Sequence, residues 1–331
     1  MSLLQSRLSN LPTADEDARQ AVRRRADNVL RPAGALAWLD EVAVWKAGWQ
    51  RSPSPTVERP AVLVFAADHG VTAAGVSNYP SEVTAAMLAA TQQGRATINA
   101  FARTAGATVT AVDVGVGVPT HDMRHEAALT HERFDEITAL AFAAVEALDT
   151  DLLVLGELGI GNTTAAAAIA AAFAGGEATV WVGRGTGVDD AGLERKQIAV
   201  QESVRRIAGV VDPLEILREV GGSELVGMAA AAVAARHRSI PIVLDGYICT
   251  ASMLPLHIAE PTALDHCIVG HCSSEPGHRL LIDRLDKHPL LDLDMRLGEG
   301  SGAMAAVPLV DMACAGVVSV ATFDEWFGPA G

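Results

Sequence analysis

Two glutamates lie in glycine-rich loops of an otherwise apolar chain, where each could act on a bound substrate. Glu157 is part of LGELGIGNTT (155–164), and Glu299 is part of RLGEGSGA (296–303). A carboxyl group with apolar flanks and no adjacent cation can have a raised pKa, which suits it to accept a proton as a general base. We therefore consider Glu299 a candidate base, with an exposed loop glutamate as the alternative interpretation.

The loop that carries Glu157 also has the features of an anion site. Gly159 and Gly161 precede Asn162 and Thr163, where an alanine-rich helix is predicted to begin. The first turn of a helix has unpaired N–H groups and a partial positive charge, which favour an anion. Glycines allow a ligand to approach the backbone closely. The loop predicts phosphate or carboxylate binding, with an ordinary Asn/Thr helix cap as the alternative.

A second glycine-rich loop, VGRGTGVDD (182–190), offers further partners for an anion. It lacks the third glycine of the dinucleotide-binding fingerprint and the Gly-Lys-Ser/Thr of a P-loop. A nicotinamide-dependent oxidoreductase is therefore disfavoured. Gly185 permits close approach of the backbone, while Arg184 and Lys196 carry positive charge. The alternative interpretation is that each of these two cations is an ordinary exposed side chain.

Two segments could supply metal ligands. One is the His/Cys-rich stretch HCIVGHCSSEPGHR (266–279), and the other is the Asp68-His69 pair after a strand-like run. The spacing of the first matches no common zinc site, in which pairs of ligands are separated by a long insert. A hydrogen-bonded core pair is the alternative at 68–69. A metal-dependent hydrolase would use Asp68, His69, His266 and His271.

Apolar strand-like runs alternate with helical patterns along most of the chain. Strands are predicted at 61–68, 108–116, 151–157, 178–183, 240–246 and 266–271, and helices within 1–50, near 81–104 and 132–148, over 165–172 and from about 190. The strand-like runs do not alternate strictly with polar residues, so both sheet faces are expected to be covered. This pattern predicts an α/β fold with a parallel sheet between helices. Ligands bind such sheets at the carboxyl ends of the strands, where the glycine-rich loops begin.

Composition excludes several classes of protein. The chain has 331 residues, of which 50% are hydrophobic, and a net charge of −15. It therefore offers a large core but not the basic surface of a nucleic-acid binder. The N-terminal stretch has no apolar core of a signal peptide, and no segment is expected to supply the ~18 apolar residues of a membrane span. Four cysteines in a chain of this length do not make a disulfide framework. These features predict a soluble, cytoplasmic protein.

Six motifs taken together resemble one enzyme family. They are, in order, FAADHGVTAAGVSNYPSEVT, GELGIGNTTAAAA, GRGTGVDDAGLERK, DGYICTASM, SSEPGHRLL and PLLDLDMRLGEGSGA, within residues 60–310. They are similar to those of nicotinate-nucleotide–dimethylbenzimidazole phosphoribosyltransferase, which makes the lower-ligand nucleotide of cobalamin. The resemblance implies a homodimer whose Rossmann-like large domain, here 56–290, is joined by a small helical domain from both chain ends, here 1–55 and 291–331.

The resemblance also implies a reaction. Enzymes of this family transfer the phosphoribosyl group of nicotinate mononucleotide to 5,6-dimethylbenzimidazole and release nicotinate and α-ribazole 5′-phosphate, with no metal or other cofactor. The glutamate of the family's GEG motif is the general base, and it falls on Glu299. Substitution at the anomeric carbon develops positive charge on the ribose, and a nearby carboxylate stabilises such charge. We assign that role to Glu157.

The remaining site residues follow from the same resemblance. Phosphate and ribose would be held by Gly159, Gly161, Asn162, Thr163, Gly185, Lys196 and Ser273, and the acceptor base by Ser77, Tyr79, Met87 and Leu297. The helix VTAAM has Ala86 where the family is expected to carry an amide. A pocket changed by one methylene shifts preference only ~10–200-fold. Adenine, another benzimidazole or a phenol are therefore alternative acceptors, and a non-catalytic nucleotide-binding regulator is an alternative function.

Overall fold

The computed structural model describes residues 1–328 and contains one sheet of six parallel strands in the order β2-β1-β3-β4-β5-β6. The strands are β1 (Pro60–Ala67), β2 (Thr108–Gly115), β3 (Leu152–Leu158), β4 (Ile242–Leu244), β5 (Cys267–Cys272) and β6 (Pro289–Asp292). The chain leaves β1 toward one edge of the sheet and leaves β3 toward the other. Connections that diverge in this way open a crevice at the carboxyl ends of the two strands. The predicted α/β class is confirmed.

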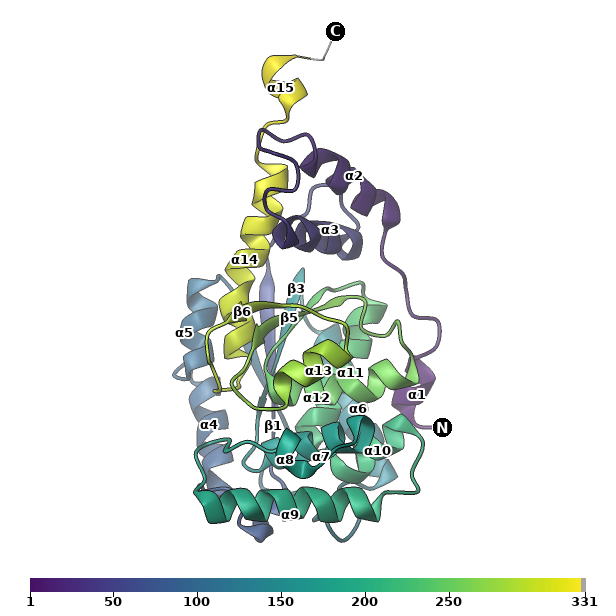
Figure 1. Ribbon diagram of the computed structural model, residues 1–331, viewed down its shortest axis with the longest axis vertical. Coiled ribbons are helices and arrows are strands. Elements are labelled where there is room, and N and C mark those ends of the chain that lie inside the picture. Colours follow the sequence, from purple (N-terminus) through teal and green to yellow (C-terminus); the bar gives the residue numbers. More distant parts are fainter. Residues whose placement is uncertain (329–331) are drawn as a thin grey trace.

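Helices cover both faces of the sheet (Figure 1). Along β1, Leu63 and Phe65 belong to one hydrophobic cluster and Val62 and Val64 to the other, because successive side chains of a strand point to opposite faces. The helices of the first cluster include α6 (His131–Glu146), α7 (Asn162–Ala174), α10 (Pro213–Val220), α11 (Ser223–His237), α12 (Tyr247–Ala259) and α13 (His278–Arg284). Those of the second include α3 (Trp38–Gln50), α4 (Glu82–Gln92), α5 (Thr97–Thr104) and α14 (Ser301–Val318).

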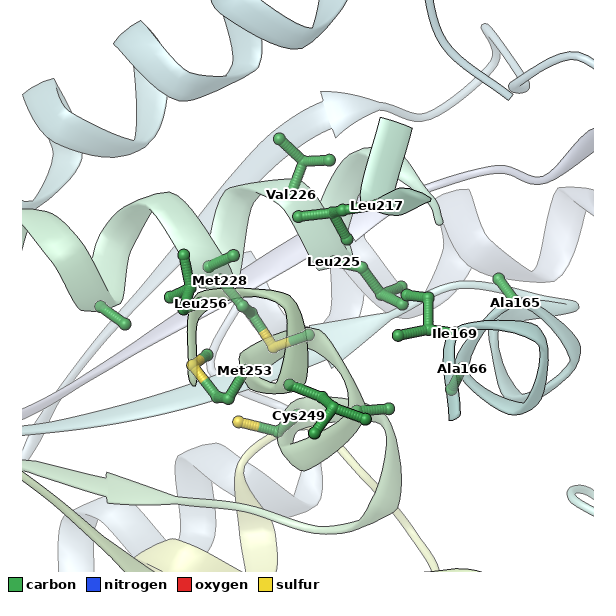
Figure 2. Close-up of a cluster of buried hydrophobic side chains, with 14 of the residues drawn as sticks. Ala165, Ala166, Ile169, Leu217, Leu225, Val226, Met228, Cys249, Met253 and Leu256 are labelled. Carbon is green, nitrogen blue, oxygen red and sulfur yellow. The ribbon is translucent and has the colours of Figure 1, made fainter. Parts of the chain in front are cut away.

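Small side chains bring the helices of the first cluster close together. Figure 2 shows Ala165, Ala166 and Ile169 of α7 beside side chains of α10, α11 and α12, including Leu217 and Met253. Alanine loses no side-chain entropy on burial and lets helix backbones approach one another. The alanine-rich run after the Glu157 loop therefore serves packing, and it fixes the position of the first turn of α7.

Segments from both ends of the chain form a helical unit at one end of the molecule. Helices α2 (Glu16–Ala26) and α3 lie beside the distal half of α14, and α15 (Phe323–Phe327) follows it (Figure 1). Arg25 joins the two ends, since its Nε donates to Val317 O at 2.9 Å. By contrast, α1 (Leu3–Arg7) packs on α6. The domain boundaries given above stay a prediction.

One predicted strand is wrong and one strand of the sheet was missed. Residues 178–183 do not form a strand but contain the short helix α8 (Ala178–Trp181). Their β-branched and aromatic residues favour a strand, but β4 occupies the place beside β3 and Trp181 is anchored instead by a bond from its Nε1 to Gly175 O at 2.8 Å. The sixth strand is β6, which was not predicted. It begins at a proline, as an edge strand can.

Three helical predictions also need correction. The segment near 81–104 is two helices, α4 and α5, because Gly94 between them has φ +75°. Within 1–50, residues 28–37 are not helical.

Of the described helices, α14 is long and apolar enough to cross a membrane by length and composition, although no such helix was expected. More than half of it is buried inside the protein, against α3, α5 and β5, so its apolar character serves the core. The remaining helix, α9 (Asp190–Arg206), begins where predicted, and a 3₁₀ turn (Gly70–Ala74) follows β1.

Candidate active site

A cavity of about 430 Å³ opens at the carboxyl ends of β3, β4 and β5. It is lined by residues from six separate segments, and these include the predicted Tyr79, Met87, Glu157, Gly159, Asn162, Thr163, Gly185, Ser273, Leu297 and Glu299. A smaller adjoining cavity of about 30 Å³ is lined by the predicted Ser77, Gly161 and Lys196, together with Gly159, Asn162 and Thr163. The fold therefore brings the predicted site residues to two connected spaces.

The Glu299 loop has an unusual backbone. Gly298, Glu299 and Gly300 have φ of +88°, +63° and +80°, a region that favours glycine. The Glu299 N–H donates to Glu157 O at 3.2 Å, which fastens this loop to the end of β3. A Cβ atom at Gly298 would lie 2.4 Å from Glu157 Oε1. Gly298 thus permits the Glu157 carboxyl to lie against the loop that carries Glu299.

The Glu299 side chain is buried, at 3% exposure, so the alternative of an exposed loop glutamate is wrong. Its Oε2 accepts a bond from the Ile98 N–H at 3.4 Å. Burial raises the pKa of Glu299, the Ile98 N–H opposes this shift, and the negative charge of Asp245 adds to it. The carboxylate is therefore a stronger proton acceptor than an exposed glutamate.

Asp245 binds the backbone that follows Glu299, at the start of α14, and was not predicted as a site residue. Its carboxylate accepts bonds from Gly300 N at 3.2 Å and Ala303 N at 2.9 Å, at the start of α14, and lies 3.3 Å from His271 Nε2. Burial opposes its ionisation, but the hydrogen bond and charge of His271 and the Ala303 N–H outweigh burial and lower the pKa of Asp245. An aspartate directly after a buried strand, in LDGY, was the available signal.

Glu157 ends β3 and is also buried. Its Oε2 accepts a bond from Asn162 Nδ2 at 2.5 Å. Burial raises the pKa of Glu157 well above its ordinary value, and the charges of Asp245 and Glu224 raise it further, while the Asn162 bond opposes them. Before substrate binds, these effects favour the neutral, protonated carboxyl.

Positive charge lies at the start of α7. Lys196 is 1% exposed, and its Nζ donates to Thr163 Oγ1 at 3.0 Å and to Gly183 O at 2.8 Å. Burial lowers the pKa of Lys196 to about 8, and Glu275 opposes this shift. The alternative of an exposed helix lysine is therefore wrong. Arg184 does lie at the surface, where it pairs with Asp190.

The histidines of the hydrolase alternative have other partners, although His271 lines the main cavity. His266 is buried in the core with Nε2 2.9 Å from Ala232 O, and burial lowers its pKa to about 3. His69 pairs with Glu224 at 2.6 Å, and His271 faces Asp245. Within residues 1–328 no three histidine, cysteine or acidic side chains gather as a group that could hold a metal ion.

A family model described as phosphoribosyltransferase matches residues 11–326. The chain is 46% identical over 318 residues to the nicotinate-nucleotide–dimethylbenzimidazole phosphoribosyltransferase of Cereibacter sphaeroides, with 95% of this chain and 93% of that protein covered. The chain belongs to the nicotinate-nucleotide–dimethylbenzimidazole phosphoribosyltransferase family. It is therefore an enzyme that transfers a phosphoribosyl group.

Two further comparisons agree with membership of the nicotinate-nucleotide–dimethylbenzimidazole phosphoribosyltransferase family. The protein of that name from Mesorhizobium japonicum is 46% identical over 317 residues, with 96% of this chain and 94% of that protein covered. The crystal structure of CobT from Thermus thermophilus has a TM-score of 0.90 at 40% identity, covering 95% of this chain and all of that one. The family's fold thus extends over almost the whole chain.

Gly156 allows this phosphoribosyltransferase to place the Glu299 loop against β3. A Cβ atom at Gly156 would lie 2.4 Å from the Glu299 carbonyl carbon. The backbone at Glu299 can move away from the new methyl group only at a cost in free energy. We therefore expect Gly156→Ala to lower the free energy of unfolding by ~1–3 kcal/mol. Displacing Glu299 by about 1 Å should also lower turnover by ~10²-fold. Denaturant unfolding and initial rates would measure both effects.

Gly209→Ala is the matched control for this change. No heavy atom of the described residues lies within 4 Å of a Cβ built at Gly209, and its backbone is not in the left-handed region. The control variant should therefore keep wild-type stability and turnover. Equal behaviour of the two variants would mean that the close approach at Gly156 is not needed.

Proposed function

We propose that the protein transfers the phosphoribosyl group of nicotinate mononucleotide to 5,6-dimethylbenzimidazole, giving α-ribazole 5′-phosphate and nicotinate. The proposal rests mainly on one observation: the buried carboxyls of Glu299 and Glu157 share a cavity that adjoins the Lys196 and Thr163 anion site. This arrangement supplies an acid–base group, a partner for positive charge and a holder for phosphate within one space. The family membership supports the same reaction.

In the proposed reaction, Glu299 is the general base. One ring nitrogen of the benzimidazole attacks the anomeric carbon with its lone pair, and the bond from that carbon to the pyridine nitrogen of nicotinate breaks. The N–H of the benzimidazole loses its proton to the Glu299 carboxylate, so no cationic product accumulates. The raised pKa of Glu299 supports this role, because a base works best when its pKa approaches the working pH.

Glu157 is proposed to stabilise the ribose as its bond to nicotinate breaks. The pKa of Glu157 is raised by burial and by neighbouring carboxylates. Positive charge on the ribose would lower that pKa again, since an opposite charge favours the ionised form. The carboxyl would therefore release its proton to water in the cavity before the bond breaks, and its negative charge would then stabilise the transition state.

The acceptor base is proposed to bind at the mouth of the cavity. Tyr79 and Leu297 are 51% and 56% exposed there, and Met87 lies beside them. A planar apolar base would cover these side chains and remove their apolar surface from water, which favours binding. Ala86 is exposed on α4 and is not among the residues that line the cavity. The homodimer implied by the family and the cytoplasmic location predicted from composition stay predictions.

The direct test is an incubation of the purified protein with nicotinate mononucleotide and dimethylbenzimidazole, in the presence of a chelator, followed by chromatography and mass analysis. We expect nicotinate and α-ribazole 5′-phosphate in equal amounts. Adenine, an unsubstituted benzimidazole and a phenol would be offered as competing acceptors. Preferred transfer to one of these would replace dimethylbenzimidazole as the substrate, and no transfer to any acceptor would contradict the proposed function.

A further inference from the structure

A carboxyl group lies where the substrate's phosphate is proposed to bind. Glu275 follows β5, lines the main cavity, and is two residues from the predicted phosphate ligand Ser273. The proposed function has no role for it. An acidic side chain at a phosphate site repels the ligand unless it is neutral, so its presence there calls for a physical explanation.

The contacts of Glu275 show that it shares its surroundings with the anion site. The Gly185 N–H lowers the pKa of its carboxyl group, which places the two groups near one another. Its Oε2 has no hydrogen-bond partner among residues 1–328 and lies against Gly183, where a Cβ atom would be only 2.0 Å away. Lys196 Nζ donates to Gly183 O at 2.8 Å, and Arg296 Nη1 donates to Gly185 O at 2.8 Å. The carboxyl and two cations thus converge on residues 183–185.

Three charged or titratable groups face Glu275 from the elements around it. They are Lys196 of α9, Arg296 of the loop before α14, and Tyr247 of α12. Burial raises the pKa of Glu275, while Lys196, Arg296 and the Gly185 N–H oppose the shift. Before substrate binds, the positive charges of Lys196 and Arg296 thus favour the carboxylate form of Glu275, against its burial.

We propose that Glu275 takes up a proton from solvent when the phosphate of nicotinate mononucleotide binds. The inference rests on the proposed function for the position of the phosphate. The incoming negative charge competes with the carboxylate for Lys196 and Arg296, and like charges in a half-buried site favour protonation of one of them.

The direction of the pH effect follows from this linkage. Glu275→Gln removes the charge but keeps an acceptor for the Gly185 N–H, so the variant should bind nicotinate mononucleotide more tightly than wild type. The ratio of the two affinities should approach one at the acidic end, below the raised pKa of Glu275, where the carboxyl is protonated before the ligand binds. It should rise with pH, and each unit by which binding raises the Glu275 pKa adds a factor of about ten.

The experiment is isothermal titration calorimetry with nicotinate mononucleotide between about pH 5 and pH 7.5. Two buffers of different ionisation enthalpy at each pH give the number of protons taken up. The upper limit avoids loss of charge on Lys196, whose pKa is about 8. Titration of the ligand's own phosphate is common to both proteins and cancels in the comparison. Wild type should take up more protons than Glu275→Gln, with weaker binding at the upper end of the range.

Two further variants control for charge and folding. Glu275→Asp keeps the charge and should keep both the proton uptake and the pH dependence. Glu82→Gln removes an exposed carboxylate of α4 and should behave as wild type, because its charge lies in solvent. Equal proton uptake and equal affinities for wild type and Glu275→Gln would overturn the inference. Failure of every folded variant to bind the nucleotide would instead contradict the proposed function.

Discussion

Glu299→Gln is expected to lower kcat for phosphoribosyl transfer by ~10²–10⁴-fold, the usual contribution of a general base. The amide has nearly the same shape and can still accept the Ile98 N–H bond, but it cannot take the proton of the benzimidazole. The Kd for nicotinate mononucleotide should stay within about twofold of wild type, because the predicted phosphate ligands lie on other segments. Steady-state rates and calorimetry would measure the two quantities separately.

The pH dependence of the wild-type enzyme provides an independent check on Glu299. The base acts only when ionised, so turnover should fall as pH falls through the pKa of Glu299. Burial raises that pKa, so the acidic limb should lie above the range of an ordinary glutamate. Glu299→Gln should lack this limb in its residual activity. A variant that keeps wild-type kcat would show that the proton leaves by another route.

The position of the site could be predicted from the sequence because glycine and polar residues follow several apolar runs. Parallel strands place such ends at one edge, and Glu157 and Ser273 indeed line the same cavity. The fold class followed from the same pattern, since Val62 and Leu63 point to opposite, equally buried faces. The fold class and the position of the site depend on local periodicity and on chain direction, and both can be inferred directly from a sequence.

What could not be predicted depends on tertiary contacts. Lys196 was predicted through the family resemblance, but the local sequence alone indicates an exposed residue of α9, and the packing of that helix brings its Nζ to Thr163. Asp245 gains its importance from the start of α14, more than fifty residues later in the chain. Likewise, nothing local distinguishes Ala178–Trp181 from a strand, because the decision depends on which segment lies beside β3.

The second large effect is expected at Glu157, where we predict that Glu157→Gln lowers kcat by ~10²–10³-fold. Gln keeps an oxygen for the Asn162 Nδ2 bond but cannot become ionised. If Glu157 stabilises charge only in the transition state, the Kd for nicotinate mononucleotide should change little. The loss should then appear in kcat and equally in kcat/KM. Single-turnover rates at saturating acceptor would separate this step from product release.

Asn162→Ala is the informative companion to Glu157→Gln. The Asn162 bond lowers the pKa of Glu157, so its removal should raise that pKa further and make ionisation harder, but still possible. We therefore expect Asn162→Ala to lose less activity than Glu157→Gln, with part of the loss recovered as pH rises. The Gln variant should show no such recovery, because it has no proton to lose. Equal, pH-independent losses in both variants would mean that the two side chains position the ribose by hydrogen bonding alone, and that charge at residue 157 does not contribute.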